Sequence, residues 1–116
     1  MTQTAYALGA ALERRIRDRL IEDGYFVIRS AGSKKVVDLA AFKPGQTLFI
    51  QCKRSGALPP ASWNALYDLA LSVGAVPVMV ENPKPRCVRW WRLTGRKDGR
   101  GGRQPMVPFE VDEVAA

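Results

Sequence analysis

Residues 36–53 read VVDLAAF, KPGQ and TLFIQCK, two apolar runs joined by a short segment that contains proline and glycine. This pattern predicts two β-strands connected in a hairpin. If the KPGQ segment joins the strands in simple register, Phe42 faces Thr47. Counting back along both strands then places Asp38 directly opposite Gln51.

One face of this hairpin is expected to carry three polar groups. Because side chains alternate along a strand, Lys53 shares a face with Gln51 and Asp38 and lies diagonally beside Asp38. Such groups are unfavourable on a half-buried sheet unless they satisfy one another or hold an ion. In a nuclease, oxygens from adjacent strands bind a hard divalent cation, and the lysine orients or activates the attacking water. For the hairpin alone, an ion pair between Asp38 and Lys53 on a solvated face is the more common arrangement.

The first helix supplies a further acidic residue. Between Ala5 and Asp23, apolar side chains recur every four positions, which is the pattern of an amphipathic helix with one face on a core. Glu13 lies at the edge of this stripe, so its carboxylate is expected to lean toward the protein body. Taken in isolation, a boundary glutamate paired with Arg17 four residues later is the simpler interpretation.

The remaining elements predict a single α/β domain. Strands are expected at 25–29, 36–42, 47–53, 75–81 and 87–93, and a second helix from Pro59 and Pro60 to Val73. This order, α-β-β-β-α-β-β, indicates a mixed β-sheet flanked by helices. Residues 1–93 are expected to form the domain, and residues 94–116 a basic, mobile C-terminal tail with an acidic tip.

Composition limits the chemistry. The 116 residues include no histidine, so Ser-His-Asp catalysis and His-ligated zinc are excluded, and carboxylates with lysine suit magnesium. Cys52 and Cys87 form neither a disulfide framework nor a metal cluster and are expected to be core thiols. No apolar run is long enough to cross a membrane and no signal peptide is evident, so a cytoplasmic protein without a membrane partner is expected.

The charge of the chain favours a polyanionic partner. Eighteen lysines and arginines against eleven acidic residues give a net charge of +7. Residues 86–103 hold seven of the basic residues and one acidic residue. A DNA-contacting segment is one interpretation of this cluster, and a solubilising surface segment is the other. Trp90 and Trp91 alternate with arginines and could stack on bases, although a tryptophan in such a strand more often belongs to a core or a dimer interface.

Several short motifs carry a resemblance to a known family. They are GAALER at residues 9–14, GYFVIRSAGS at 24–33, Asp38, and QCK at 51–53. In this order and spacing the chain resembles, over residues 9–81, the archaeal-type Holliday junction resolvases of the PD-(D/E)XK nuclease superfamily. The resemblance implies a restriction-endonuclease-like fold and a homodimer that acts on branched DNA, the four-way junction.

The resemblance also implies roles for individual residues. Glu13, Asp38 and Gln51 would bind Mg²⁺, for which Mn²⁺ can substitute, and Lys53 would assist the attack of water. Ser33 would contribute to cleavage, with Ser30 as the alternative. Gln51 departs from the family pattern, in which an acid stands at this position, so metal affinity is expected to fall. DNA contacts are expected from Arg14, Arg29, Ser30, Lys34, Lys35 and Arg54.

These observations predict a Mg²⁺-dependent, structure-selective DNA endonuclease that resolves four-way (Holliday) junctions by paired phosphodiester hydrolysis. One alternative is a less selective PD-(D/E)XK nuclease of the repair or restriction type. Another is a catalytically inactive DNA-binding module, in which Gln51 marks the loss of metal. The dimer contact is expected on exposed faces of the second helix and of the strand that contains Trp90 and Trp91.

Overall fold

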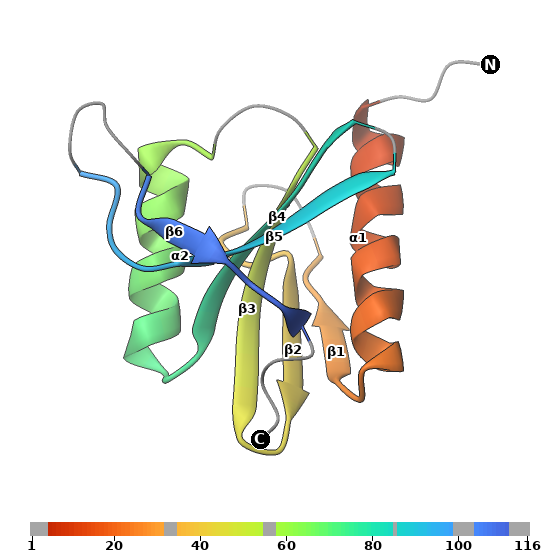
Figure 1. The fold of residues 1–116 in the computed structure, drawn as a ribbon, viewed down its shortest axis with the longest axis horizontal. Helices are drawn as coiled ribbons and strands as arrows, with labels where there is room; N and C mark the ends of the chain where they lie inside the picture. The colour runs from red at the N-terminus through yellow and green to blue at the C-terminus, as the bar shows by residue number, and fades with distance from the viewer. Residues whose placement is uncertain (1–4, 32–34, 55–57, 85, 99–103, 112–116) are drawn as a thin grey trace.

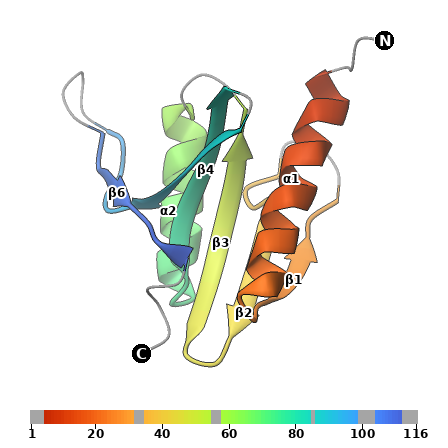
Figure 2. The ribbon, with the colours of Figure 1, turned by 45° about the vertical axis from the view of Figure 1, so that its right-hand side comes forward.

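A six-stranded mixed sheet lies between two helices, one on each of its faces (Figures 1 and 2). The structure is a computed structural model that describes residues 5–31, 35–54, 58–84, 86–98 and 104–111. The elements are α1 (Ala5–Glu22), β1 (Phe26–Arg29), β2 (Leu39–Lys43), β3 (Gln46–Lys53), α2 (Pro60–Ser72), β4 (Val76–Lys84), β5 (Cys87–Leu93) and β6 (Met106–Pro108). The predicted α/β fold with helices flanking a mixed sheet is therefore confirmed.

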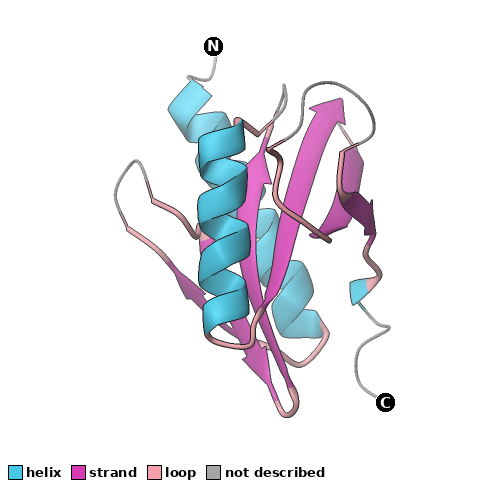
Figure 3. Cartoon of the chain, turned by 90° about the vertical axis from the view of Figure 1, so that its left-hand side faces the viewer, coloured by secondary structure: helices cyan, strands magenta, loops and turns pink. Residues whose placement is uncertain are grey.

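The strands follow one another across the sheet in chain order, β1-β2-β3-β4-β5-β6. All neighbouring strands pair antiparallel except β3 and β4, which are parallel. The helix α2 connects these two strands and returns the chain to the end of the sheet at which β3 begins, so β4 runs in the same direction. In Figure 3 the strands run between the two helices. No helix in the described part of the chain is both long and apolar enough to span a membrane.

Each helix covers its own hydrophobic core. On one face, Leu12, Ile16 and Leu20 of α1 are buried against a core that includes Leu39 and Ile50 of the hairpin. On the other face lies the core of α2, made of Leu58, Trp63, Leu66, Met79 and Leu93. Because successive side chains of a strand point to opposite faces of the sheet, the central strands contribute side chains to both cores. The α1-side core anchors the helix that carries Glu13 directly onto the hairpin that carries Asp38.

The register of the β2–β3 hairpin is the predicted one. Phe42 pairs with Thr47, and the pairing continues to Leu39 with Ile50, the last pair before Asp38 and Gln51. Lys43 also pairs with Gln46, so only Pro44 and Gly45 form the turn. Gly45 has a φ of 78°, a left-handed conformation that favours glycine.

The strand β2 begins three residues later than expected, at Leu39 instead of Val36. Asp38 explains the difference. Its main-chain N–H still donates to Ile50 O at 2.8 Å, but the next donor on β3, the N–H of Cys52, bonds the Asp38 carboxylate at 2.7 Å. A side-chain oxygen therefore takes the place of a main-chain acceptor, and the regular ladder ends at this point.

The strand β4 extends beyond its expected end at Glu81 to Lys84. Its pairing with β5 shifts between Glu81 and Lys84, an irregularity that accommodates Pro83, which has no N–H to donate. The Asn82 side chain donates to the carbonyl oxygens of Lys84 and Cys87, both at 2.8 Å, and so holds the tip of the hairpin.

The chain after Leu93 is not the tail that the sequence predicted. Among the described residues beyond Leu93, β6 pairs with β5, and Phe109 and Val111 belong to the α1-side core. The indole N–H of Trp63 donates to Gly95 O at 2.8 Å. The expectation of a mobile segment without core residues is thus wrong for 94–98 and 104–111, because a strand and two buried side chains hold this part of the chain on the domain.

Trp90 and Trp91 do not form one exposed aromatic face. As neighbours on β5 they point to opposite sides of the sheet, so Trp90 packs against the α1-side core and Trp91 against the α2-side core. Both are half-buried. Cys52 and Cys87 are free thiols, and Cys52 packs against the α1-side core as expected.

Candidate active site

The candidate site lies where β2 begins and β3 ends, beside α1. Asp38 is the buried acidic residue of the described chain, with a relative exposure of 6%. Its oxygen Oδ2 accepts the hydrogen bond from Cys52, and its own carbonyl accepts one from Ser30 N–H at 2.9 Å. Asp38 is therefore held from both sides, at its carboxylate by β3 and at its main-chain carbonyl by the segment that follows β1.

Glu13 reaches this site from α1, as the sequence predicted, but its partners differ from those considered. Its Oε1 lies 2.9 Å from Arg29 Nε and 3.6 Å from Lys35 Nζ. Arg17, the simpler partner considered, is paired with the adjacent Asp18 instead. Only 13% of the Glu13 side chain is exposed, so this carboxylate faces the protein body.

Lys35 stands between the two carboxylates. Its Nζ lies 3.6 Å from Glu13 Oε1 and 3.7 Å from Asp38 Oδ1, and it donates to Ser30 O at 3.0 Å. The expected alternative pairing of Asp38 with Lys53 is not the one observed, since Asp38 is paired with Lys35. The ammonium group of Lys35 thus marks a position at which oxygens from two elements converge on a positive charge.

The electrostatics of the site reflect two carboxylates close together in a buried place. Burial raises the pKa of the Asp38 carboxyl above its usual value; the hydrogen bond from Cys52 N–H opposes this rise, while the charge of Glu13 adds to it. Burial also raises the pKa of the Cys52 thiol well above its usual range, and the charges of Asp38 and Glu13 raise it further. Cys52 therefore remains protonated and acts as a core side chain.

Gln51 lies beside Asp38, as the predicted register requires. Its amide is satisfied when the nitrogen faces Asp38, where it can donate to Asp38 Oδ2 and to Val36 O, each at 3.2 Å. The sequence predicted the amide oxygen as a metal ligand. In this orientation Gln51 instead supplies a donor to the carboxylate, and a rotation of the amide is needed to present its oxygen.

Other predicted residues surround this cluster. Arg29 and Lys35 were expected to contact DNA, and here both are paired with carboxylates. Arg14 is exposed on α1, and Lys53 and Arg54 are half-buried at the end of β3. Ser33 and Lys34 lie outside the described residues, whereas Ser30 is held by its main chain.

The site opens into a cleft of about 400 Å³ between the start of β2 and the start of α2. Asp38, Gln51 and Lys35 line one side, and Ala61, Ser62 and Ala65 of α2 line the other. The small side chains on α2 leave room for a substrate group to approach the carboxylates.

The donor set fits a single hard cation. Two carboxylates and one amide oxygen are the ligand types that Mg²⁺ accepts, and the ammonium of Lys35 already occupies a cation position between the carboxylates. No group of three or more His, Cys, Asp or Glu side chains with metal-ligand spacing occurs in the described residues. The sequence did not place Lys35 in this cluster. Its position three residues before Asp38 is the feature of the sequence that could have indicated an ion pair between the two.

Comparisons with known proteins identify the half of the chain that builds this site. A family model described as archaeal Holliday junction resolvase (Hjc) matches residues 4–59. This part of the chain is similar to the Hjc family. The predicted resemblance is therefore confirmed, and the Hjc match contains Glu13, Asp38, Gln51 and Lys53.

Two individual relatives agree with the Hjc match. The crossover junction endodeoxyribonuclease Hjc of Methanocaldococcus jannaschii is 46% identical over 50 residues, which cover 43% of this chain and 37% of that protein. The chain thus matches little more than a third of the length of this curated relative. The solved structure of Archaeoglobus fulgidus Hjc, a Holliday junction resolvase, superimposes with a TM-score of 0.58 at 26% identity, covering 69% of this chain and 72% of that one.

Proposed function

We propose that this protein is a divalent-metal-dependent endonuclease that cuts branched DNA at four-way junctions. The observation that carries the proposal is the pair of carboxylates, Glu13 and Asp38, that converge on one positive charge at the end of the hairpin. The relatives named above are a crossover junction endodeoxyribonuclease and a Holliday junction resolvase. Mg²⁺ is the proposed metal, with Mn²⁺ as a substitute.

In this proposal Glu13 and Asp38 hold the cation, and Gln51 adds a neutral oxygen after its amide rotates. A bound divalent cation supplies a water of lowered pKa and neutralises charge that develops on the phosphate. Lys53, which makes no ion pair among the described residues, is the ammonium available to orient the attacking water. Ser33, or Ser30 in its place, is proposed to assist cleavage.

The basic residues around the site have a second proposed task. If a divalent cation were held by the two carboxylates, their ion pairs with Arg29 and Lys35 would weaken, and both basic side chains could contribute to binding the scissile phosphate. Arg14 and Arg54 extend this positive surface on either side, and Lys34 is proposed to join it.

Paired incision requires two sites related by a twofold axis, which a homodimer provides. Support for a dimer comes from apolar side chains that α2 leaves uncovered on its face of the sheet. Phe26 and Ile28 of β1 are 68% and 51% exposed, and Phe42, which pairs with Phe26, is 37% exposed. Leu69, Leu71 and Val73 add exposed apolar surface at α2. We propose that these groups form the self-complementary contact.

A specific observation favours a second candidate function, an inactive DNA-binding module. Among the residues that the structure describes, two carboxylates form the site, and the Gln51 amide is satisfied with its nitrogen, not its oxygen, toward Asp38. A module of this kind would bind the junction without cutting it. The less selective nuclease is the remaining alternative.

Incubation with a labelled four-way junction and a matching linear duplex, with Mg²⁺ or with chelator, tests these functions. We expect paired symmetric nicks in the junction only when metal is present. Asp38→Asn should abolish cutting and leave binding intact, whereas the matched control Asp18→Asn, an exposed acid on α1, should cut normally. Cutting of both substrates would select the less selective nuclease, and tight binding without cutting would select the inactive module.

A further inference from the structure

A groove with a basic rim runs between α1 and the β4–β5 hairpin, which leans toward α1 in Figure 1. One part of it, with a volume of about 620 Å³, lies between α1, β5 and the chain that follows β6. A second part of about 400 Å³ lies between α1 and the tip of the hairpin. Arg15 lines both parts, so they lie next to each other along α1.

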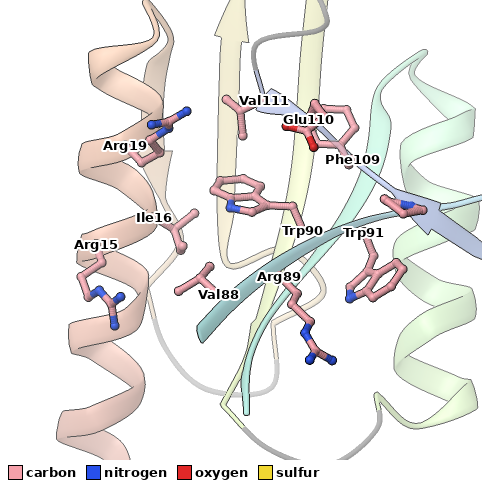
Figure 4. A pocket seen from close by; sticks show the side chains of 11 residues that line it. Arg15, Ile16, Arg19, Val88, Arg89, Trp90, Trp91, Phe109, Glu110 and Val111 are labelled. Atoms are coloured by element: carbon pink, nitrogen blue, oxygen red, sulfur yellow. The ribbon is translucent and has the colours of Figure 1, made fainter. Parts of the chain in front are cut away.

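The floor of the larger part is apolar and includes an aromatic ring. Trp90 projects from β5 toward α1, between Ile16 and Val111 (Figure 4). Phe109 completes this floor. Trp90 is half-buried, so one side of its indole packs on the core and the rest is available to the groove. The proposed nuclease chemistry does not use this ring.

The rim of the groove is positively charged. Its basic side chains come from α1, from β4 and from the segments that follow each of β3 and β4: Arg15, Arg19, Arg54, Lys84 and Arg86. Glu110 is the acidic residue that lines it. Arg54 directly follows Lys53, so the groove reaches the C-terminal end of β3, the strand that carries Gln51 and Lys53. A ligand that continues from the scissile phosphate along this path must be a polyanion.

A single strand of DNA has the required chemistry. Its bases are unpaired and can stack on an aromatic side chain, whereas those of a duplex are stacked inside the helix. A cavity of this volume is large enough for one nucleotide. We propose that the groove binds one unpaired DNA strand, with a base stacked on Trp90 and a backbone phosphate bound by Arg15. The proposal rests on the DNA-cleaving function proposed above, since that function brings the strand to Arg54.

Binding of a fluorescent oligothymidylate of about 12 nucleotides to the metal-free protein, followed by anisotropy in chelator, tests the groove without any cleavage. Trp90→Leu, which keeps an apolar side chain on the floor, should weaken binding about ten-fold by removing the stacking partner. Tyr67→Leu is the matched control, because the half-buried Tyr67 ring packs against the core on the other face and lines neither part of the groove. This control should bind as the parent does.

Arg15→Gln gives an independent test at an exposed position on α1 where folding is not at risk. It should weaken oligonucleotide binding and reduce the slope of log K against log salt by about one phosphate contact. If Trp90→Leu does not fold, the arginine variant alone tests whether the groove binds the oligonucleotide. Parent-like affinity of folded Trp90→Leu, an unchanged salt slope for Arg15→Gln, or preference for an acidic aromatic peptide over the oligonucleotide would overturn the groove assignment. Loss of junction cleavage with oligonucleotide binding intact would instead overturn the nuclease function.

Discussion

At the scale of single residues, Asp38 connects the fold to the proposed chemistry. Its carboxylate ends the β2–β3 ladder by accepting from Cys52 N–H, and it shares the cation position with Glu13. The hairpin register predicted that Asp38 and Gln51 lie side by side, and the helical stripe predicted that Glu13 leans toward the protein body. The family resemblance was needed to group these three residues. These patterns could not predict Lys35 as the shared partner, because its position depends on the loop before β2, nor the amide orientation of Gln51, which depends on its hydrogen-bond partners.

The raised pKa of Asp38 gives a stability prediction with a definite sign. A carboxyl whose native pKa is raised binds its proton more tightly in the folded state, so it favours folding below the ordinary pKa near 4. This contribution is lost as the pH rises through the native pKa. Asp38→Asn keeps an acceptor for Cys52 N–H and lacks the ionisation, so in chelator at pH 7 it should be more stable than the parent.

Urea denaturation from pH 4 to pH 7 measures this difference, which should grow with pH. Asp18→Asn, at an exposed position, should show no such growth. A variant that loses stability at pH 7 would mean that the ion pair with Lys35 outweighs the burial of the charge.

At the scale of elements, the long periodic segments were predictable and the C-terminal one was not. Both helices and the strands up to β5 have apolar periods that extend over several residues, which is the signal that sequence reasoning uses. The strand β6 has only three residues and no such period. The burial of Phe109 and Val111 depends on the surface that α1 and β5 present, and a local pattern carries no information on that surface.

Truncation after Leu93 should therefore unfold the domain or greatly destabilise it. It removes β6, two core side chains and the acceptor of the Trp63 indole N–H. Loss of a buried phenylalanine alone costs about 3 kcal/mol or more, a large part of the stability of a small domain.

Thermal unfolding followed by circular dichroism measures the effect. Truncation after Val111 is the control, because it keeps β6 and both core side chains, and its midpoint should match that of the full chain. A cooperative transition at the parent temperature after truncation at Leu93 would show that the packing of the last segment contributes nothing.

At the scale of the whole molecule, one face of the sheet is only partly covered. The helix α2 covers β3 and β4, while Phe26 and Phe42 remain exposed beside it. Adjacent exposed aromatic side chains of this kind mark interaction surfaces in proteins that otherwise present polar side chains. Sequence could predict the exposed apolar side of α2 but not this contribution from β1 and β2, because it depends on how far across the sheet α2 reaches.

Sedimentation at micromolar concentration should give twice the 12.8 kDa chain mass. Phe26→Arg should yield a monomer, because it places a charge at the centre of the apolar contact. Ile21→Arg, which alters an equally exposed apolar residue on α1, should leave the dimer intact. A monomeric parent, or equal dissociation in both variants, would exclude this face as the contact.

The central claim is that Glu13 and Asp38 form a site for a divalent cation. Calorimetric titration of the parent with Mn²⁺ tests it most directly, since binding is measured without DNA and without turnover. We expect one ion per chain, no binding to Asp38→Asn, and tighter binding to Gln51→Glu, which adds a charged ligand. Absence of binding to the parent, or binding that persists unchanged in Asp38→Asn, would contradict the account.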